Sequence, residues 1–121
     1  MVSSITNYKG TKWETRVVNY LRAEGFEADR LRTSGRDDEG DIRLVINGRT
    51  YIIEAKDDRS NRLGPWADRV LHKAANYARH RGELYVPYNF VLHKRLGSTK
   101  VGEALVVMNF HEYLSEQAWR P

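Results

Sequence analysis

The sequence predicts one domain of mixed helix and sheet, an α/β or α+β fold, on three observations. Apolar residues recur at helical spacing in two segments, residues 11–24 and 65–81. Between them, β-forming residues lie on both sides of Asn47-Gly48, the preferred two-residue turn of a β-hairpin. The length of 121 residues fits a single domain, which we expect over residues 1–121.

The expected elements follow one another along the chain. They are a helix over residues 11–24, a strand over 26–33, a polar loop over 34–40, hairpin strands over 41–46 and 50–56, a helix over 65–81, strands over 88–94 and 104–109, and a short helix over 111–117. The first helix is predicted from the apolar spacing of Trp13, Val17, Tyr20 and Leu21, and Gly25 is expected to end it.

The helix after the hairpin carries Pro65 in its first turn, where proline is tolerated. Its apolar stripe consists of Trp66, Val70, Leu71, Ala74, Tyr77 and Ala78. Its basic residues, expected on the exposed side, are Arg69, His72, Lys73, Arg79, His80 and Arg81. These charges are spread along the helix, which favours a solvated surface over a tight DNA-binding patch.

The hairpin places two carboxylates against each other. With a two-residue turn, Ile46 pairs with Arg49, and continuing this register puts Asp41 opposite Glu54. Opposed residues hold their Cβ atoms about 4.5–5.5 Å apart, a distance at which two carboxylates repel each other. A hard divalent cation such as Mg²⁺, which takes carboxylate oxygens as ligands, would account for the pair.

Lys56 shares the strand face of Glu54, because side chains alternate along a strand with a period of two. Its ammonium could hold an attacking water or stabilise charge on a phosphate. The opposite face of the hairpin is expected to be core and consists of Ile42, Leu44, Ile46, Tyr51, Ile53 and Ala55. The alternative is an exposed hairpin end that carries a Glu–Lys pair and an unrelated aspartate.

These residues resemble the signature of the PD-(D/E)XK nuclease superfamily, namely Gly40-Asp41, a gap, and then Glu54-Ala55-Lys56. The upstream sequence narrows the resemblance to the archaeal-type Holliday junction resolvases and phage proteins similar to them. That upstream sequence is, in order, Gly10-Thr11-Lys12-Trp13-Glu14, Leu21, Gly25-Phe26, Arg30 or Arg32, and Ser34-Gly35. The superfamily's usual proline before the aspartate is Gly40 here.

The resemblance implies a restriction-endonuclease-like fold, in which helices flank a mixed central sheet. It also implies an Mg²⁺-dependent endonuclease, with Mn²⁺ as a substitute, that cuts four-way DNA junctions as a homodimer. Asp41 and Glu54 would bind the metal, with the Ala55 carbonyl as a third ligand. Lys56 would position or activate the attacking water.

Glu14 and Ser34 complete the implied site. Glu14 would bind the metal directly or through water, and its position partly toward the apolar side of its helix independently requires a partner. The alternative for Glu14 is a salt bridge with an arginine. Ser34 would lie in a loop near the scissile phosphate, and its alternative is a plain turn residue before Gly35.

Basic residues around the expected site are the candidates for DNA contact. They are Arg30, Arg32 and Arg36 before the hairpin, and Lys94, Arg95 and Lys100 around the last loop. The net charge of +4 agrees with a polyanionic partner, and phosphate contacts would supply salt-sensitive affinity. No recognition helix or zinc-finger spacing is evident, which favours recognition of DNA shape over base sequence.

Two other functions remain open from the sequence. One is a flap, nicking or other replication-repair nuclease of the same superfamily, and the other is a catalytically silent DNA-binding module. For a homodimer, either the helix of Trp66 or the apolar strand Leu105-Val106-Val107-Met108 could supply the interface.

The composition excludes thiolate metal sites and disulfides, because the chain has no cysteine. Neither a signal peptide nor an apolar run long enough to span a bilayer is evident. A cytoplasmic location is therefore expected.

Overall fold

The computed structural model describes residues 3–31 and 38–118, with side chains from residue 12 onward in the first helix. Its elements are, in order, α1 (Ser3–Ala23), β1 (Glu27–Arg30), β2 (Ile42–Ile46), β3 (Arg49–Lys56), α2 (Leu63–His80), β4 (Tyr88–His93), the 3-10 helix η2 (Val101–Glu103), β5 (Leu105–Val107) and α3 (Phe110–Ala118). The predicted order is confirmed, with η2 as an addition. None of the described helices has the length and apolarity needed to cross a membrane.

Helix α1 begins at Ser3 rather than at residue 11. The prediction missed residues 3–10 because they lack the apolar spacing on which it relied. The helix ends at Ala23, one residue before the predicted Glu24, and Gly25 follows with a φ of +90° that suits glycine. There the N–H of Phe26 donates to the carbonyl of Leu21, the bond that closes a Schellman-type helix end.

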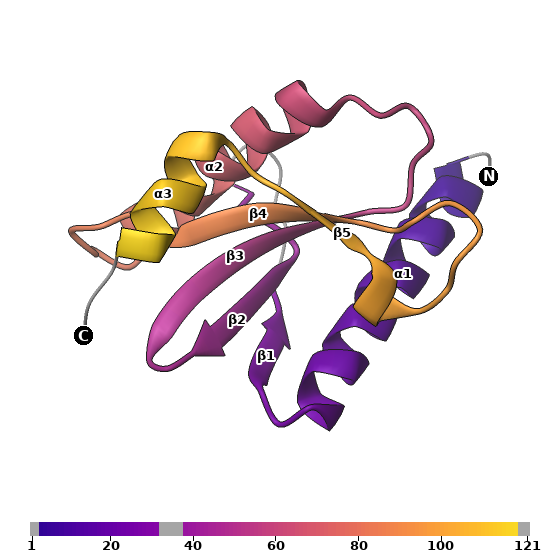
Figure 1. The fold of residues 1–121 in the computed structure, drawn as a ribbon, viewed down its shortest axis with the longest axis horizontal. Helices are drawn as coiled ribbons and strands as arrows, with labels where there is room; N and C mark the ends of the chain where they lie inside the picture. The colour runs from indigo at the N-terminus through magenta and orange to yellow at the C-terminus, as the bar shows by residue number, and fades with distance from the viewer. Residues whose placement is uncertain (1–2, 32–37, 119–121) are drawn as a thin grey trace.

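Five strands form one mixed sheet in the order β1-β2-β3-β4-β5. Strands β3 and β4 are parallel, and every other neighbouring pair is antiparallel. Parallel neighbours need a crossover, and α2 supplies it between β3 and β4 (Figure 1). Strand β3 therefore lies at the centre of the sheet, and β5 lies at its edge.

Helices α1 and α2 cover opposite faces of the sheet (Figure 1). Trp13 and Val17 of α1 pack on the face that carries Ile53, whereas Trp66 of α2 packs on the face that carries Ile52. Strand β3 is consequently buried on both faces, since residues 51–55 are all buried. The alternative of an exposed hairpin end around Glu54 is therefore wrong, because α2 covers that face.

Candidate active site

The turn of the hairpin sets the register that the sequence predicted. Asn47 and Gly48 both have positive φ, at 52° and 79°, which is the conformation of a type I′ turn. Strands β2 and β3 then pair regularly from Ile46 with Arg49 to Ile42 with Ile53. This register places the start of β2 beside the end of β3, at the end of the hairpin away from the turn. Asp41 and Glu54 both lie at this end.

Asp41 departs from the regular ladder directly after this last pair. Its N–H donates to the Ile53 carbonyl at 3.0 Å, and its carboxylate Oδ2 accepts a 2.8 Å hydrogen bond from the N–H of Ala55. Its carbonyl accepts from the N–H of Leu31. The side chain of Asp41 therefore turns back toward β3. The predicted direct pairing of Asp41 with Glu54 is absent, because the regular ladder ends one residue earlier, at Ile42 and Ile53.

Gly40 makes this departure possible. Its φ is +103°, a value that proline, with φ fixed near about −65°, does not adopt. A Cβ at this position would lie 2.6 Å from Cγ2 of Ile52, an atom of the buried core. The residue before the catalytic candidate Asp41 must therefore be glycine in this backbone, which explains the absence of the superfamily's usual proline.

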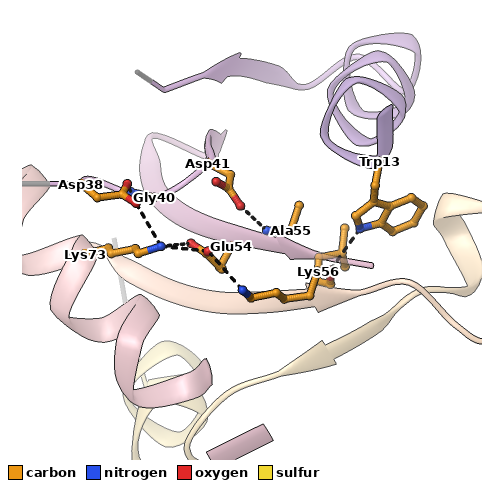
Figure 2. A network of polar contacts seen from close by, with 9 residues as sticks. Trp13, Asp38, Gly40, Asp41, Glu54, Ala55, Lys56 and Lys73 are labelled. Atoms are coloured by element: carbon orange, nitrogen blue, oxygen red, sulfur yellow. Dashed lines mark hydrogen bonds and ion pairs between the residues drawn. The ribbon is translucent and has the colours of Figure 1, made fainter. Parts of the chain in front are cut away.

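Glu54 lies at the centre of a polar network beneath α2 (Figure 2). Its carboxylate is only 6% exposed and receives two 2.9 Å hydrogen bonds from Nζ of Lys73. Nζ of Lys56 lies 3.9 Å from Oε1 of Glu54 and 5.6 Å from the centre of the Trp66 ring. Lys56 thus shares the face of Glu54, as the strand period predicted.

Lys73 was expected on the exposed side of its helix, and this expectation is wrong. Its side chain is 13% exposed, and its Nζ also lies 3.1 Å from Oδ2 of Asp38. The sequence held a signal for this position, because Lys73 stands seven residues after Trp66 and four before Tyr77, on the apolar stripe itself. Asp38 carried no comparable signal within its polar loop.

The segment that leads into Asp41 is fastened to α2. The side-chain amide of Asn76 donates to the Asp38 carbonyl at 3.0 Å. Glu39 binds Nδ1 of His80 at 2.5 Å and the guanidinium of Arg81 at 2.7 Å. Burial opposes ionisation of Glu39, but these two partners outweigh it and lower the pKa of Glu39. His80 and Arg81 thus serve to hold this segment rather than forming a purely solvated surface.

Glu14 approaches the same site from α1. Its carboxylate binds the guanidinium of Arg30 at 3.2 Å, so the salt bridge considered as its alternative is present. Burial nevertheless raises the pKa of Glu14, and the nearby charges of Glu54 and Asp38 act in the same direction. Glu14 therefore belongs electrostatically to the acidic cluster, and Arg30 is its salt-bridge partner.

The electrostatics of Asp41 fit a cation-binding site. Burial raises the pKa of Asp41 to about 8, and the charges of Glu54 and Glu14 contribute to this rise. A bound cation would relieve this repulsion. Within the described residues no three His, Cys, Asp or Glu side chains are already gathered as metal ligands. Mg²⁺ does not need three, because it is typically held by one or two carboxylates together with waters and substrate phosphates.

Beside the site, the loops after β3 and β4 enclose a hollow of about 400 Å³, which Lys94 and Arg95 help to line. Lys94 lies 4.0 Å from Asp57, whereas Arg95 is exposed. Lys100 is exposed farther along the same loop. The predicted basic loop therefore borders the candidate site. Arg32, Ser34 and Arg36 lie outside the described residues.

Comparisons with known proteins matched one family model and a solved structure. The model of a family described as archaeal Holliday junction resolvase (Hjc) matches residues 5–107. Among solved structures, the chain is similar to Hjc of Archaeoglobus fulgidus, a Holliday junction resolvase from an archaeal hyperthermophile. That similarity has a TM-score of 0.52 at 19% sequence identity and covers 88% of each chain. No curated protein sequence matches significantly. The expected restriction-endonuclease-like fold is confirmed.

Proposed function

We infer that this chain, which belongs to the archaeal Holliday junction resolvase family, is a divalent-metal-dependent endonuclease that hydrolyses DNA phosphodiester bonds at four-way junctions. Junction resolution follows from the family, whereas the metal and the residue roles are our proposals. The observation that carries the proposed chemistry is the gathering of Asp41, Glu54 and Lys56 at one end of the β2–β3 hairpin. We expect the enzyme to act on DNA in the cytoplasm.

Asp41 and Glu54 are the proposed metal ligands, with the Ala55 carbonyl as a third and Glu14 as a direct or water-mediated fourth. Oxygen donors of this kind suit Mg²⁺, and Mn²⁺ is expected to substitute for it. When bound, the cation would neutralise developing charge and lower the pKa of a coordinated water. The N–H of Ala55 holds the carboxylate of Asp41 in place, so the chain itself orients one ligand.

Lys56 is the proposed residue for the attacking water. The Trp66 ring lies 5.6 Å from its Nζ, and Glu54 lies 3.9 Å away, so two contacts restrict where the ammonium can point. An ammonium in this position can donate hydrogen bonds to water or to a phosphate oxygen. Ser34 is proposed near the scissile phosphate, on the resemblance alone.

The proposed function is tested by cleavage of a synthetic four-way junction beside flap, fork and linear duplexes of the same sequence. We expect Mg²⁺-dependent cleavage, with paired cuts in the junction and much slower cutting of the controls. Equal rates on flap and junction substrates would contradict junction specificity. Cleavage that persists in a metal chelator would contradict the metal dependence.

Phosphate contacts are proposed for the basic loop that borders the site, together with Arg32 and Arg36. Alanine at Arg95 or Lys100 should weaken junction binding and reduce the slope of log affinity against log salt by about 0.9 each, because one fewer counterion is released. Fluorescence anisotropy over a salt series measures this slope. Alanine at Arg69, an exposed residue of α2, is the control and should leave the slope unchanged.

The edge of the sheet is the proposed homodimer interface. Strand β5 and helix α3 expose the large apolar side chains of Leu105, Val106, Phe110, Tyr113 and Leu114. Clustered apolar residues on a sheet edge favour association with a second copy. The helix of Trp66 was the other candidate, and we favour the sheet edge because Trp66 itself is 3% exposed and packs in the core.

The substitution Val106→Glu should weaken this dimer by at least about tenfold, since a central apolar contact contributes on the order of 2 kcal/mol. Sedimentation velocity over a concentration series would show the shift toward monomer. Leu96→Glu is a matched control, because Leu96 is exposed in the loop before η2. A dimer unaffected by Val106→Glu would place the interface elsewhere.

A further inference from the structure

Lys73 of α2 is the shared partner of two carboxylates that come from different parts of the chain. Its Nζ lies 2.9 Å from both oxygens of Glu54 and 3.1 Å from Oδ2 of Asp38. The side chains of Lys73, Glu54 and Asp38 are 13%, 6% and 22% exposed. Figure 2 shows Lys73 and Lys56 reaching Glu54 from different elements, α2 and β3.

Neither carboxylate can easily turn away from this position. Glu54 lies on the central strand with its side chain enclosed. The backbone of Asp38 is held by Asn76, and Asp38 also accepts a hydrogen bond from the N–H of Gly40 at 2.8 Å. Without a cation between them, two enclosed carboxylates would repel each other at considerable cost. The ammonium therefore occupies a place between carboxylate oxygens that a metal ion could otherwise take.

The negative and positive side chains in the described part of the site nearly balance in number. Four carboxylates interact electrostatically there, those of Glu14, Asp38, Asp41 and Glu54. Three cations accompany them, those of Arg30, Lys56 and Lys73. When all are ionised, these seven side chains together carry one net negative charge. One divalent cation changes that sum to one net positive charge, which suits an approaching phosphodiester, and two change it to three.

We propose that Lys73 is a positioning residue that acts as a built-in cation, holding Glu54 and Asp38 together so that the active site takes one divalent metal ion per chain. The inference rests on the proposed function, because it assumes that Asp41 and Glu54 bind a metal. Lys73 acts through Glu54: it holds both oxygens of a proposed ligand from the α2 side, and each oxygen retains a further lone pair for a metal. Asp38 lies outside the superfamily signature and pairs with Lys73 through its Oδ2.

The test is the stoichiometry of Mn²⁺ binding to the DNA-free protein, measured by calorimetry and by electron paramagnetic resonance. The wild type should bind one Mn²⁺ per chain. Lys73→Met removes the cation between the two carboxylates and should raise the stoichiometry to two. Lys73→Arg keeps the charge and should bind one. The double variant Lys73→Met/Asp38→Asn removes one of the paired carboxylates and should also return to one.

Each result bears on a separate claim. Two Mn²⁺ per wild-type chain would overturn the role of Lys73 while leaving the metal-dependent function intact. One Mn²⁺ per chain in Lys73→Met, with unchanged affinity, would overturn it as well. No Mn²⁺ binding by the wild type would refute the metal site on which the inference rests. If Lys73→Met unfolds without metal, Mn²⁺ should restore its thermal transition, and failure to do so would count against the proposal.

Discussion

Replacing Asp41 with asparagine is expected to slow junction cleavage by at least about 10³-fold, while junction binding changes little. Asparagine keeps the size of the side chain and an oxygen that can accept the hydrogen bond from the N–H of Ala55. It removes the charge that would draw a divalent cation to the site. The loss should therefore fall on the chemical step, measured by single-turnover cleavage at saturating enzyme.

Binding and cleavage must be measured separately for this conclusion. Anisotropy with a labelled junction in Ca²⁺ should give similar dissociation constants for wild type and Asp41→Asn, because the proposed phosphate contacts lie on other residues. Asp29→Asn is a suitable control, since Asp29 is an exposed residue of β1 that pairs with Arg22 and Arg43. Normal cleavage by Asp41→Asn would show that the proposed site is wrong.

The hairpin was predictable because its register depends on local chemistry. Asn47 and Gly48 adopt the positive φ values that their residue types favour, and the pairing of β2 with β3 follows from the turn. The position of Asp41 was less predictable, because it depends on Gly40 and its close approach to the Ile52 side chain. The alternation of side chains along a strand does not show at which residue the pairing of two strands ends.

The parts of the site that sequence reasoning missed come from long-range packing. Lys73 was assigned to a solvated face with the other basic residues of its helix, because these charges are spread along the helix. Its partners, Glu54 and Asp38, are distant in sequence and meet it only because α2 crosses over the sheet. A charged residue on an otherwise apolar stripe indicates a buried partner of opposite charge, since burying an unpaired charge would be too costly.

The second large effect is expected on stability in the absence of metal, where Asp41→Asn should be more stable than the wild type at pH 8. The pKa of Asp41 is raised from its usual 3.8 to about 8 by burial and by the charges of Glu54 and Glu14. Between these two values the folded chain retains a proton that the unfolded chain releases. The free energy of unfolding of the wild type therefore falls as pH rises through this window.

Asparagine carries no such proton, so the two proteins should have similar stability near pH 4 and diverge as pH approaches 8. The divergence should be on the order of a few kcal/mol, since one pKa unit corresponds to about 1.4 kcal/mol. Urea denaturation in a metal chelator at pH 4.5, 6 and 8 measures it.

Adding Mg²⁺ at pH 8 should stabilise the wild type and have less effect on the variant, because the cation favours the ionised carboxylate that asparagine lacks. A variant that is less stable than the wild type at pH 8 without metal would mean that Asp41 is not under electrostatic strain in the folded chain. The burial and the repulsion that weaken the metal-free fold would also favour a bound cation in the working enzyme, so the loss of activity and the gain in stability should arise together from this one substitution.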